Sequence, residues 1–218
     1  MESLNKIFSM KIAYVINCIN TTTGLEKMVF AQTDYFIKNF NYEIELILVN
    51  QKSDDAKPIF EINENIKLHY LNIYSGGLKK FYLRIKRINK KIKQIAPDIV
   101  MVCIDEVFGL YLASLLKKNQ PFLYQRHSTK NLNVVNANGI KQNSIKDSLK
   151  KIVISRSGLG YDRFVLLTKE HTKDWPHLKK IAIINNPNVL TTEGKQAKLN
   201  NKVIIAVGRQ DYVKGFDM

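Results

Sequence analysis

The sequence has little cysteine and no long apolar run, and these absences exclude several classes of protein. Its 218 residues include two cysteines, Cys18 and Cys103, and no CxxC pair, so neither a disulfide scaffold nor a zinc site is indicated. Both lie in apolar runs, which predicts reduced, buried thiols in a cytosolic protein. No stretch reaches the roughly 18 apolar residues of a membrane-spanning helix. Lys6 and Lys11 interrupt the place where a signal peptide has its apolar core, so we expect a cytoplasmic chain.

The loop after the first predicted strand lacks the two common phosphate-binding fingerprints. Residues 20–26 read NTTTGLE, with neither the GxGxxG of dinucleotide-binding folds nor the GKS or GKT of a P-loop. This absence disfavours NAD and ATP enzymes of those types. Thr23 and Glu26 match a helix capping box, whereas Gly24 at a helix amino terminus would let an anionic ligand approach closely. Both interpretations remain open, and they are compatible.

Positive charge is what the sequence has in excess. Lys and Arg number 34 against 19 Asp and Glu, a net charge of +15. Residues 78–95 hold eight basic residues and no acid, residues 130–156 hold six and one, and together they carry 13 of the 15 charges. The apolar residues of the first stretch recur every three or four positions, which predicts a helix with one apolar face and one basic face: Phe81, Ile85, Ile88, Ile92 and Ile95.

An exposed basic helix face attracts polyanions, either nucleic acid or anionic lipid headgroups. At about 1 kcal/mol for each well-placed Lys or Arg, such a face could hold a protein on an acidic membrane. The sequence has no signature of an RRM, KH, helix-turn-helix or zinc domain, so nucleic acid is the disfavoured partner. The alternative is a surface helix whose basic face is solvated and binds no partner.

Short apolar runs alternate with helix-like segments, which predicts an α/β fold with a Rossmann-like, doubly wound parallel sheet. Helices are expected at 24–40, 78–95 and 107–118, and strands at 10–17, 43–50, 66–72, 98–104, 122–126, 163–168 and 180–185. Ligands of such sheets bind beyond the carboxyl ends of the strands. The expected site therefore lies in the segments that follow strands: 17–26, 105–106, 126–130 and 168–171.

The composition changes after Pro187, which predicts a domain boundary. Residues 1–186 form the first α/β domain, the polar residues 187–201 a linker, and residues 202–218 the first strand of a second α/β unit. Arg209 and Lys214 follow that strand, next to an expected helix start. Such a pair suits a diphosphate, or the two residues are solvated surface charges. His127, after the strand at 122–126, is either a catalytic candidate or a structural histidine.

Five segments resemble, in order and spacing, the family-four glycosyltransferases of the GT-B fold. VGRQDYVKGFD at 207–217 resembles the VGR…KGFD segment that opens the family's donor-binding half. MKIAYVINCINTTTGLEKM at 10–28 resembles its first strand and glycine loop, and APDIVMV at 96–102 its KPDIV strand. RHS at 126–128 and IINNPNV at 183–189 resemble its EHS segment and its IPNPV turn.

The resemblance implies a retaining enzyme that moves a sugar from a nucleotide-sugar donor to a glycan or lipid-linked acceptor in cell-envelope polysaccharide synthesis. The nucleotide-sugar would be a co-substrate, with no cofactor and no metal. Residues 1–186 would be the acceptor-side domain and 202–218 the truncated start of the donor domain. His127 would be catalytic, beside the transferring sugar, and Arg209 and Lys214 would hold the donor diphosphate. Thr23, Gly24 and Glu26 would line the cleft.

Two departures from the family limit these expectations. Thr23-Gly24 stands where the family has paired glycines, and the family's paired glutamates lie beyond Met218. We therefore expect no transfer by residues 1–218 alone. A further series of strands and helices after Met218 with that glutamate pair would favour the enzyme. A stop at Met218 would favour the alternative, a non-catalytic basic module that docks on an anionic membrane or glycan.

Many members of this family work at the cytoplasmic face of a membrane, so the resemblance favours anionic lipid as the partner of the basic face and a peripheral location on the inner face of the cell membrane. The predicted membrane contacts are five basic residues of the helix at 78–95: Lys79, Arg84, Lys86, Lys90 and Lys93.

Overall fold

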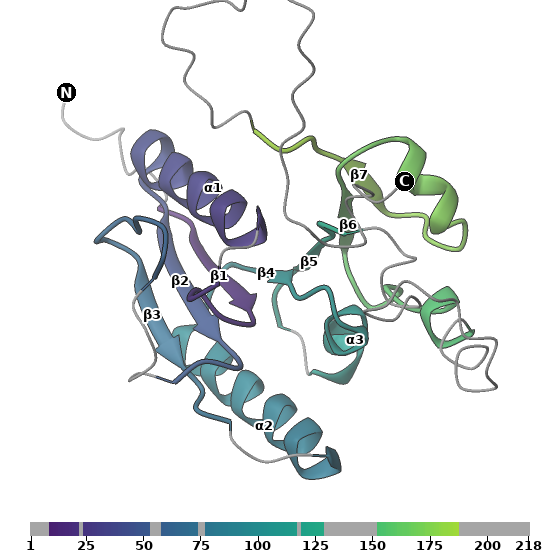
Figure 1. The fold of residues 1–218 in the computed structure, drawn as a ribbon, viewed down its shortest axis with the longest axis horizontal. Coiled ribbons are helices and arrows are strands. Elements are labelled where there is room, and N and C mark those ends of the chain that lie inside the picture. The colour runs from purple at the N-terminus through teal and green to yellow at the C-terminus, as the bar shows by residue number, and fades with distance from the viewer. Residues whose placement is uncertain are drawn as a thin grey trace, which may run out of the picture.

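The alternating apolar runs fold as the strands of one parallel sheet. A computed structural model describes residues 9–21, 24–52, 58–73, 77–116, 119–128 and 152–187. Within these residues the sheet has seven strands in the order β3-β2-β1-β4-β5-β6-β7 (Figure 1). The strands are β1 (Lys11–Ile16), β2 (Glu43–Leu48), β3 (Lys67–Tyr70), β4 (Ile99–Cys103), β5 (Phe122–Gln125), β6 (Arg163–Leu166) and β7 (Ile181–Ile183).

Helices cover both faces of the sheet, as a doubly wound fold requires. Helix α1 (Gly24–Phe40) packs on one face, with Val29 and Phe30 among the strand side chains there. Helices α2 (Gly77–Ile95) and α3 (Val107–Leu115) pack on the opposite face (Figure 1). The predicted α/β class and Rossmann-like parallel sheet are therefore confirmed.

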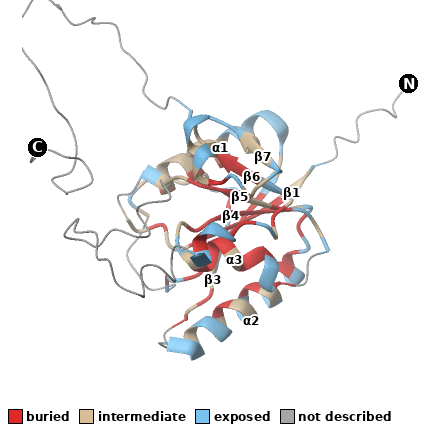
Figure 2. Ribbon diagram, turned by 90° about the vertical axis from the view of Figure 1, so that its right-hand side faces the viewer, coloured by how far each residue is buried: buried red, intermediate tan, exposed pale blue. Residues whose placement is uncertain are grey.

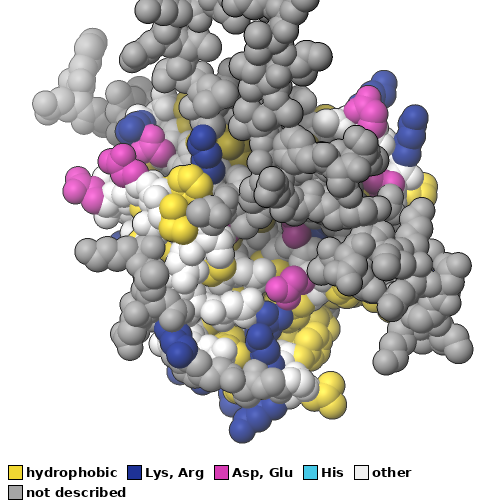
Figure 3. Space-filling view, viewed as in Figure 1, with side chains coloured by type: hydrophobic (Ala, Val, Ile, Leu, Met, Phe, Trp, Pro, Cys, Tyr) yellow, Lys and Arg dark blue, Asp and Glu magenta, His cyan; other side chains and the backbone are white. Residues whose placement is uncertain are grey.

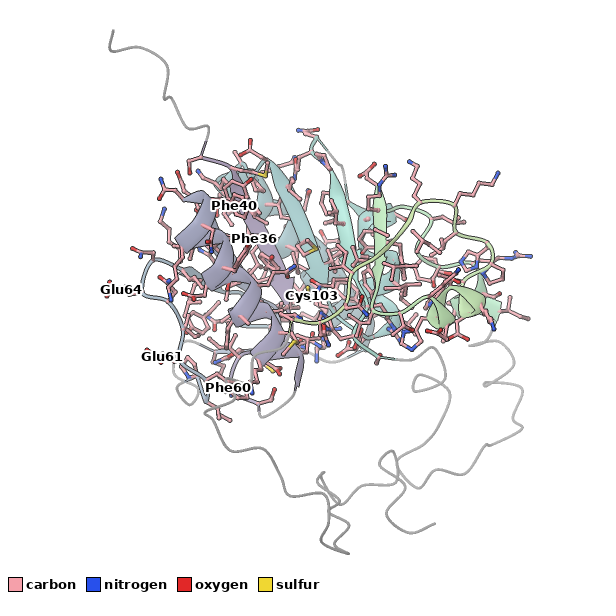
Figure 4. The ribbon with its side chains drawn as sticks, turned by 90° about the horizontal axis from the view of Figure 1, so that it is seen from above. Phe36, Phe40, Phe60, Glu61, Glu64 and Cys103 are labelled. Carbon is pink, nitrogen blue, oxygen red and sulfur yellow. The ribbon has the colours of Figure 1, made fainter. Side chains whose placement is uncertain are left out.

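The central strands are buried on both faces, which explains why they read as unbroken apolar runs. Every residue of Ile12–Ile16 in β1 is buried, as is Val100–Cys103 in β4 (Figure 2). Cys103 lies at the middle of the molecule (Figure 4), and burial raises the pKa of its thiol far above the usual range. Cys18 differs from our expectation of two buried thiols. It is only half-buried, because it follows β1 in a loop instead of lying within a strand.

The predicted helix boundaries hold closely for α1 and α2. Helix α2 ends as expected before Pro97, with Ala96 in a left-handed conformation at φ 48°. Helix α3 ends at Leu115, earlier than the predicted residue 118, and the strands are up to three residues shorter than predicted. The short 3-10 helix Glu170–Asp174 was not predicted. The loop expected at 127–139 lies outside the described residues from 129 onward, and the linker at 187–201 and the strand near 202 lie outside them after Pro187.

The strand order reverses beside β1, and this places several loops at one edge. Ile16 of β1 pairs with Cys103 of β4 in register, and β2 pairs with β1 on its other side. The segments after β1 and β4 therefore emerge next to each other while the chain turns to opposite faces. In open α/β sheets this switch point is where ligands bind. None of the helices in the described ranges is both long and apolar enough to span a bilayer.

Gly109 allows α3 to pack closely on the end of β4. A Cβ at this position would overlap the carbonyl oxygen of Ile104, and the Tyr161 hydroxyl donates a hydrogen bond to the Gly109 carbonyl. We expect Gly109→Ala to lower the free energy of unfolding by about 1–3 kcal/mol in urea titrations, the usual cost of overpacking. Gly24→Ala is the matched control, since the described part of the chain places no atom within 4 Å of its Cβ position. Equal stability of the two variants would contradict this packing.

Candidate functional site

A cavity of about 700 Å³ opens at the carboxyl ends of β1, β4 and β5. Three of the four predicted strand-end segments line it, namely those after β1, β4 and β5. The fourth, at 168–171, runs into the 3-10 helix and is not part of the wall. The wall residues are Asn17, Cys18, Thr21, Gly24, Leu25, Glu26, Met28, Cys103, Asp105, Glu106, His127, Ser128 and Asn186.

Arg126 ties two of these strand ends together from inside the protein. It is 1% exposed, and its Nε donates a hydrogen bond to the Ser128 carbonyl at 2.9 Å. Its Nη1 donates to the Asp105 carbonyl at 2.8 Å and lies 3.5 Å from the Asp105 carboxylate. The guanidinium also lies 6.0 Å from the Trp175 ring. A buried cation needs such partners, so Arg126 holds the loops after β4 and β5 in one arrangement.

His127 lies in the cavity wall, as predicted. Its backbone N–H points to Oδ1 of Asp105 at 3.4 Å. Burial lowers the pKa of the imidazole, Asp105 and Glu26 oppose that shift, and Arg126 adds to it. The neutral imidazole is therefore favoured at neutral pH. Its Nε2 is buried and has no hydrogen-bond partner among the described residues. A neutral ring nitrogen in this setting can donate to or accept from a ligand hydroxyl.

The predicted cleft residues of the first loop also line the cavity. Gly24 begins α1 and is exposed, whereas Glu26, two residues later, is only 5% exposed. One carboxylate oxygen of Glu26 accepts a hydrogen bond from the Thr21 hydroxyl at 2.6 Å. Thr23, the partner expected for the capping box, lies outside the described residues. So do Arg209 and Lys214, and their proposed diphosphate contact stays a prediction.

Arg84 is not on the outward face of α2, and our expectation that it faces a membrane is wrong. It is 8% exposed. Its Nη1 lies 3.1 Å from Oε2 of Glu106, and its Nη2 donates to Oδ1 of Asn50 at 2.6 Å. Position 84 precedes the buried Ile88 by four residues, so it lies on the inward face of the helix. Glu106 provides the charge that makes an inward arginine stable there.

The other four predicted membrane contacts, unlike Arg84, are exposed to solvent. Lys79, Lys86, Lys90 and Lys93 are exposed along α2, which has no acidic residue. Lys and Arg side chains gather over this helix at the lower edge of Figure 3. The exposed apolar side chains Leu78 and Tyr82 lie in its first two turns. The second basic stretch, at 130–156, falls mostly outside the described residues.

A second hollow, of about 590 Å³, lies between α1 and the segment that contains Phe60, Glu61 and Glu64 (Figure 4). Asp34 of α1 lines it and is held by Lys38 and Asn63, which lower the pKa of its carboxyl. This hollow is away from the strand ends. Within the described segments no group of three His, Cys, Asp or Glu side chains is arranged to hold a metal ion.

Sequence reasoning identified most of the wall but missed Arg126, Asn17 and Glu106 as individual site residues. The rule that ligands bind at strand ends included all three positions. No motif distinguished them, because their roles arise from side-chain contacts between loops that are distant in sequence.

A curated relative matches almost the whole chain. An uncharacterised glycosyltransferase of Haemophilus influenzae is 28% identical over 212 residues, which cover 95% of this chain and 55% of the relative. The chain thus spans about half the length of the relative that it matches.

Solved structures share the fold. A glycosyltransferase from Rickettsia africae superposes with a TM-score of 0.54 at 18% identity, over 82% of this chain and 43% of that one. A UDP-GlcNAc 2-epimerase from Methanocaldococcus jannaschii, solved in complex with UDP-GlcNAc and UDP, superposes with a TM-score of 0.51 at 14% identity, over 81% and 47%. Residues 11–164 match the family described as glycosyl transferase 4-like. This match covers more than half of the chain, which therefore belongs to the glycosyl transferase 4-like family.

Proposed function

We propose that this chain is the acceptor-side half of a retaining glycosyltransferase that moves a sugar from a nucleotide-sugar to a glycan or lipid-linked acceptor in cell-envelope polysaccharide synthesis. The observation that carries the proposal is the cavity at the switch point of the sheet, with His127 and Glu26 in its wall. In such a reaction the anomeric carbon passes from a diphosphate oxygen to an acceptor hydroxyl oxygen, and the hydroxyl proton must leave.

The chemistry of the wall suits a sugar substrate. Neutral His127 offers a ring nitrogen with no partner among the described residues, and a sugar hydroxyl can both donate and accept. Gly24 leaves space at the start of α1, because no atom of the described residues outside its chain neighbours lies within 4 Å of its Cβ position. A substrate can therefore approach the backbone of α1 closely.

Two further findings support a nucleotide-sugar donor and a transfer reaction. The epimerase with the same fold was solved with UDP-GlcNAc and UDP. Because that fold also serves an epimerase, it does not separate the two reactions. The family match over residues 11–164 and the Haemophilus influenzae relative favour transfer. The chain covers 55% of that relative, and we propose that Arg209 and Lys214, in the last ten residues of the chain, contact the donor diphosphate.

The transfer reaction is tested with the protein expressed from its whole reading frame. We expect it to release nucleoside diphosphate from one member of a nucleotide-sugar panel and to attach the sugar to a glycan or lipid-linked acceptor, as detected by mass spectrometry. Residues 1–218 alone should show no transfer. If the whole protein released no nucleotide but still bound anionic vesicles, the non-catalytic module would be the better account.

His127 is expected to matter for this transfer. We expect His127→Ala in the whole protein to lower kcat about a hundredfold or more, the usual effect of removing one pre-positioned hydrogen-bonding group from the reacting centre. His171→Ala is the control, since His171 lies in the 3-10 helix and is not part of the cavity wall. Thermal unfolding of both variants checks the fold. A His127→Ala protein with unchanged kcat would exclude the catalytic role.

We further propose that the exposed lysines of α2 hold the protein on the inner face of the cell membrane from the cytoplasm. This face has no acidic residue and carries Lys79, Lys86, Lys90 and Lys93. The nearby exposed side chains of Leu78 and Tyr82 would contact the headgroup region. Exposed lysines next to exposed apolar side chains such as Leu78 and Tyr82 are typical of helices that lie on anionic bilayers.

Membrane binding is tested by co-sedimentation with vesicles of phosphatidylglycerol and phosphatidylcholine. We expect the triple variant Lys86→Glu, Lys90→Glu, Lys93→Glu to lose binding by about a hundredfold or more, from roughly 1 kcal/mol per basic residue. The control with the same change of net charge is Lys169→Glu, Lys173→Glu, Lys179→Glu, at exposed lysines near β7. Equal losses in both variants would show that only net charge matters, and would overturn a specific role for α2.

A further inference from the structure

Four side chains form a closed ring of hydrogen bonds at the edge of the cavity. Nη1 of Arg84 donates to Oε2 of Glu106 at 3.1 Å, and Nη2 donates to Oδ1 of Asn50 at 2.6 Å. Nδ2 of Asn50 donates to Oδ1 of Asn17 at 2.9 Å, and Nδ2 of Asn17 donates to Oε1 of Glu106 at 3.2 Å. The ring joins α2, the ends of β1 and β2, and the residue before α3.

The four members of the ring have different exposure to the cavity. Asn17 and Glu106 line it, whereas Arg84 and Asn50 do not. Arg84 is 8% exposed and its guanidinium lies 5.0 Å from the centre of the Phe108 ring in α3. Two supporting side chains, one of them a buried cation stacked on an aromatic ring, therefore hold two side chains that face a ligand.

Asn17 and Glu106, the two ring members that line the cavity, can form hydrogen bonds beyond those of the ring. Asn17 has a second amide N–H, and each Glu106 oxygen has a second lone pair. A donor beside an acceptor matches a pair of neighbouring hydroxyls on a sugar, since each hydroxyl both donates and accepts. A phosphate offers only acceptors here, so it could accept from the Asn17 N–H but would leave the free lone pairs of Glu106 without a donor.

The charges around the cavity point to the same ligand. Its charged wall residues are the acids Glu26, Asp105 and Glu106, and among the described residues no lysine or arginine lines it. Asp105 and Glu106 are paired with the buried Arg126 and Arg84, so the described part of this wall has no excess of positive charge and offers an anionic ligand no cationic side chain.

We propose that Glu106 and Asn17 bind the hydroxyls of an uncharged sugar unit of the acceptor, and that Arg84 is the positioning residue that holds both in place. This inference rests on the proposed function for its biological setting. It predicts that the part of the cavity wall formed by Asn17 and Glu106 prefers neutral sugar rings to uronic acids and sugar phosphates. A fixed carboxylate discriminates well, because a ligand that lacks the matching hydroxyl leaves polar groups unpaired.

The test measures binding directly and needs no transfer activity. The 218-residue chain, labelled with ¹⁵N, is titrated with methyl glycosides of neutral hexoses and with methyl glucuronide, and the side-chain amide signal of Asn17 is followed. We expect at least one neutral glycoside to shift this signal at millimolar concentration, and methyl glucuronide to leave it unchanged.

Variants separate positioning from general folding. Glu106→Gln and Arg84→Met should each weaken binding of the neutral glycoside about tenfold or more, as for a lost charge-assisted hydrogen bond. The double variant should be no weaker than either single variant, because both changes break the same contact. Arg87→Met is the matched control on the same helix, since the Arg87 guanidinium bonds the carbonyls of Leu71 and Asn72 instead.

Each outcome decides the matter. Unchanged binding in Glu106→Gln, no response of Asn17 to any neutral glycoside, or equal losses in Arg87→Met and Arg84→Met would overturn the inference. Tight binding of methyl glucuronide at Asn17 would overturn the preference for neutral sugars. A failed transfer assay with an intact glycoside response would count against the proposed function alone.

Discussion

A charged guanidinium in the protein interior must be surrounded by acceptors, and the arrangement of the candidate site depends on this constraint. Arg126 is 1% exposed and takes its acceptors from the Asp105 carbonyl and carboxylate and from the Ser128 carbonyl. Removing a partner would leave a buried charge without compensation, which is among the more costly changes a protein can suffer. The loops after β4 and β5 are therefore held together, and His127, in the loop after β5, lies in the wall of the cavity.

A second arginine has the same effect at the next residue along the chain, Glu106. Arg84 joins α2 to the ends of β1 and β2 through Glu106 and Asn50. Both arginines are turned inward, while the exposed lysines of α2 face outward and the cavity wall carries acids. The net charge of +15 is thus separated by location. The exposed lysines of α2 suit an anionic surface, and the polar wall of the cavity suits hydroxyl groups. Both features fit the proposed glycan acceptor and the proposed membrane contact.

The fold could be predicted because parallel strands that are buried on both faces are continuous apolar runs in the sequence, and because Pro97 marks a helix end. The sequence also predicted where the cavity lies, since strand ends at a switch point share one edge. It could not predict the contacts among Arg84, Glu106 and Asn17, which come from three separate segments. Counting Arg84 among the outward charges was an error of periodicity, because the spacing from Ile88 already placed it inward. The half-buried state of Cys18 depended on where β1 ends, and strand ends are poorly defined by apolar pattern alone.

The central claim is that these buried pairings enclose His127 in the cavity wall in its neutral form. The most direct measurement is an NMR titration of its imidazole in the 218-residue chain, with His127→Gln used to assign the signal among the four histidines. Because burial outweighs the nearby carboxylates, the account predicts a pKa below the ordinary value of 6.5. A pKa at or above 6.5 would mean that the ring is open to water or governed by Asp105 and Glu26, and would contradict the account.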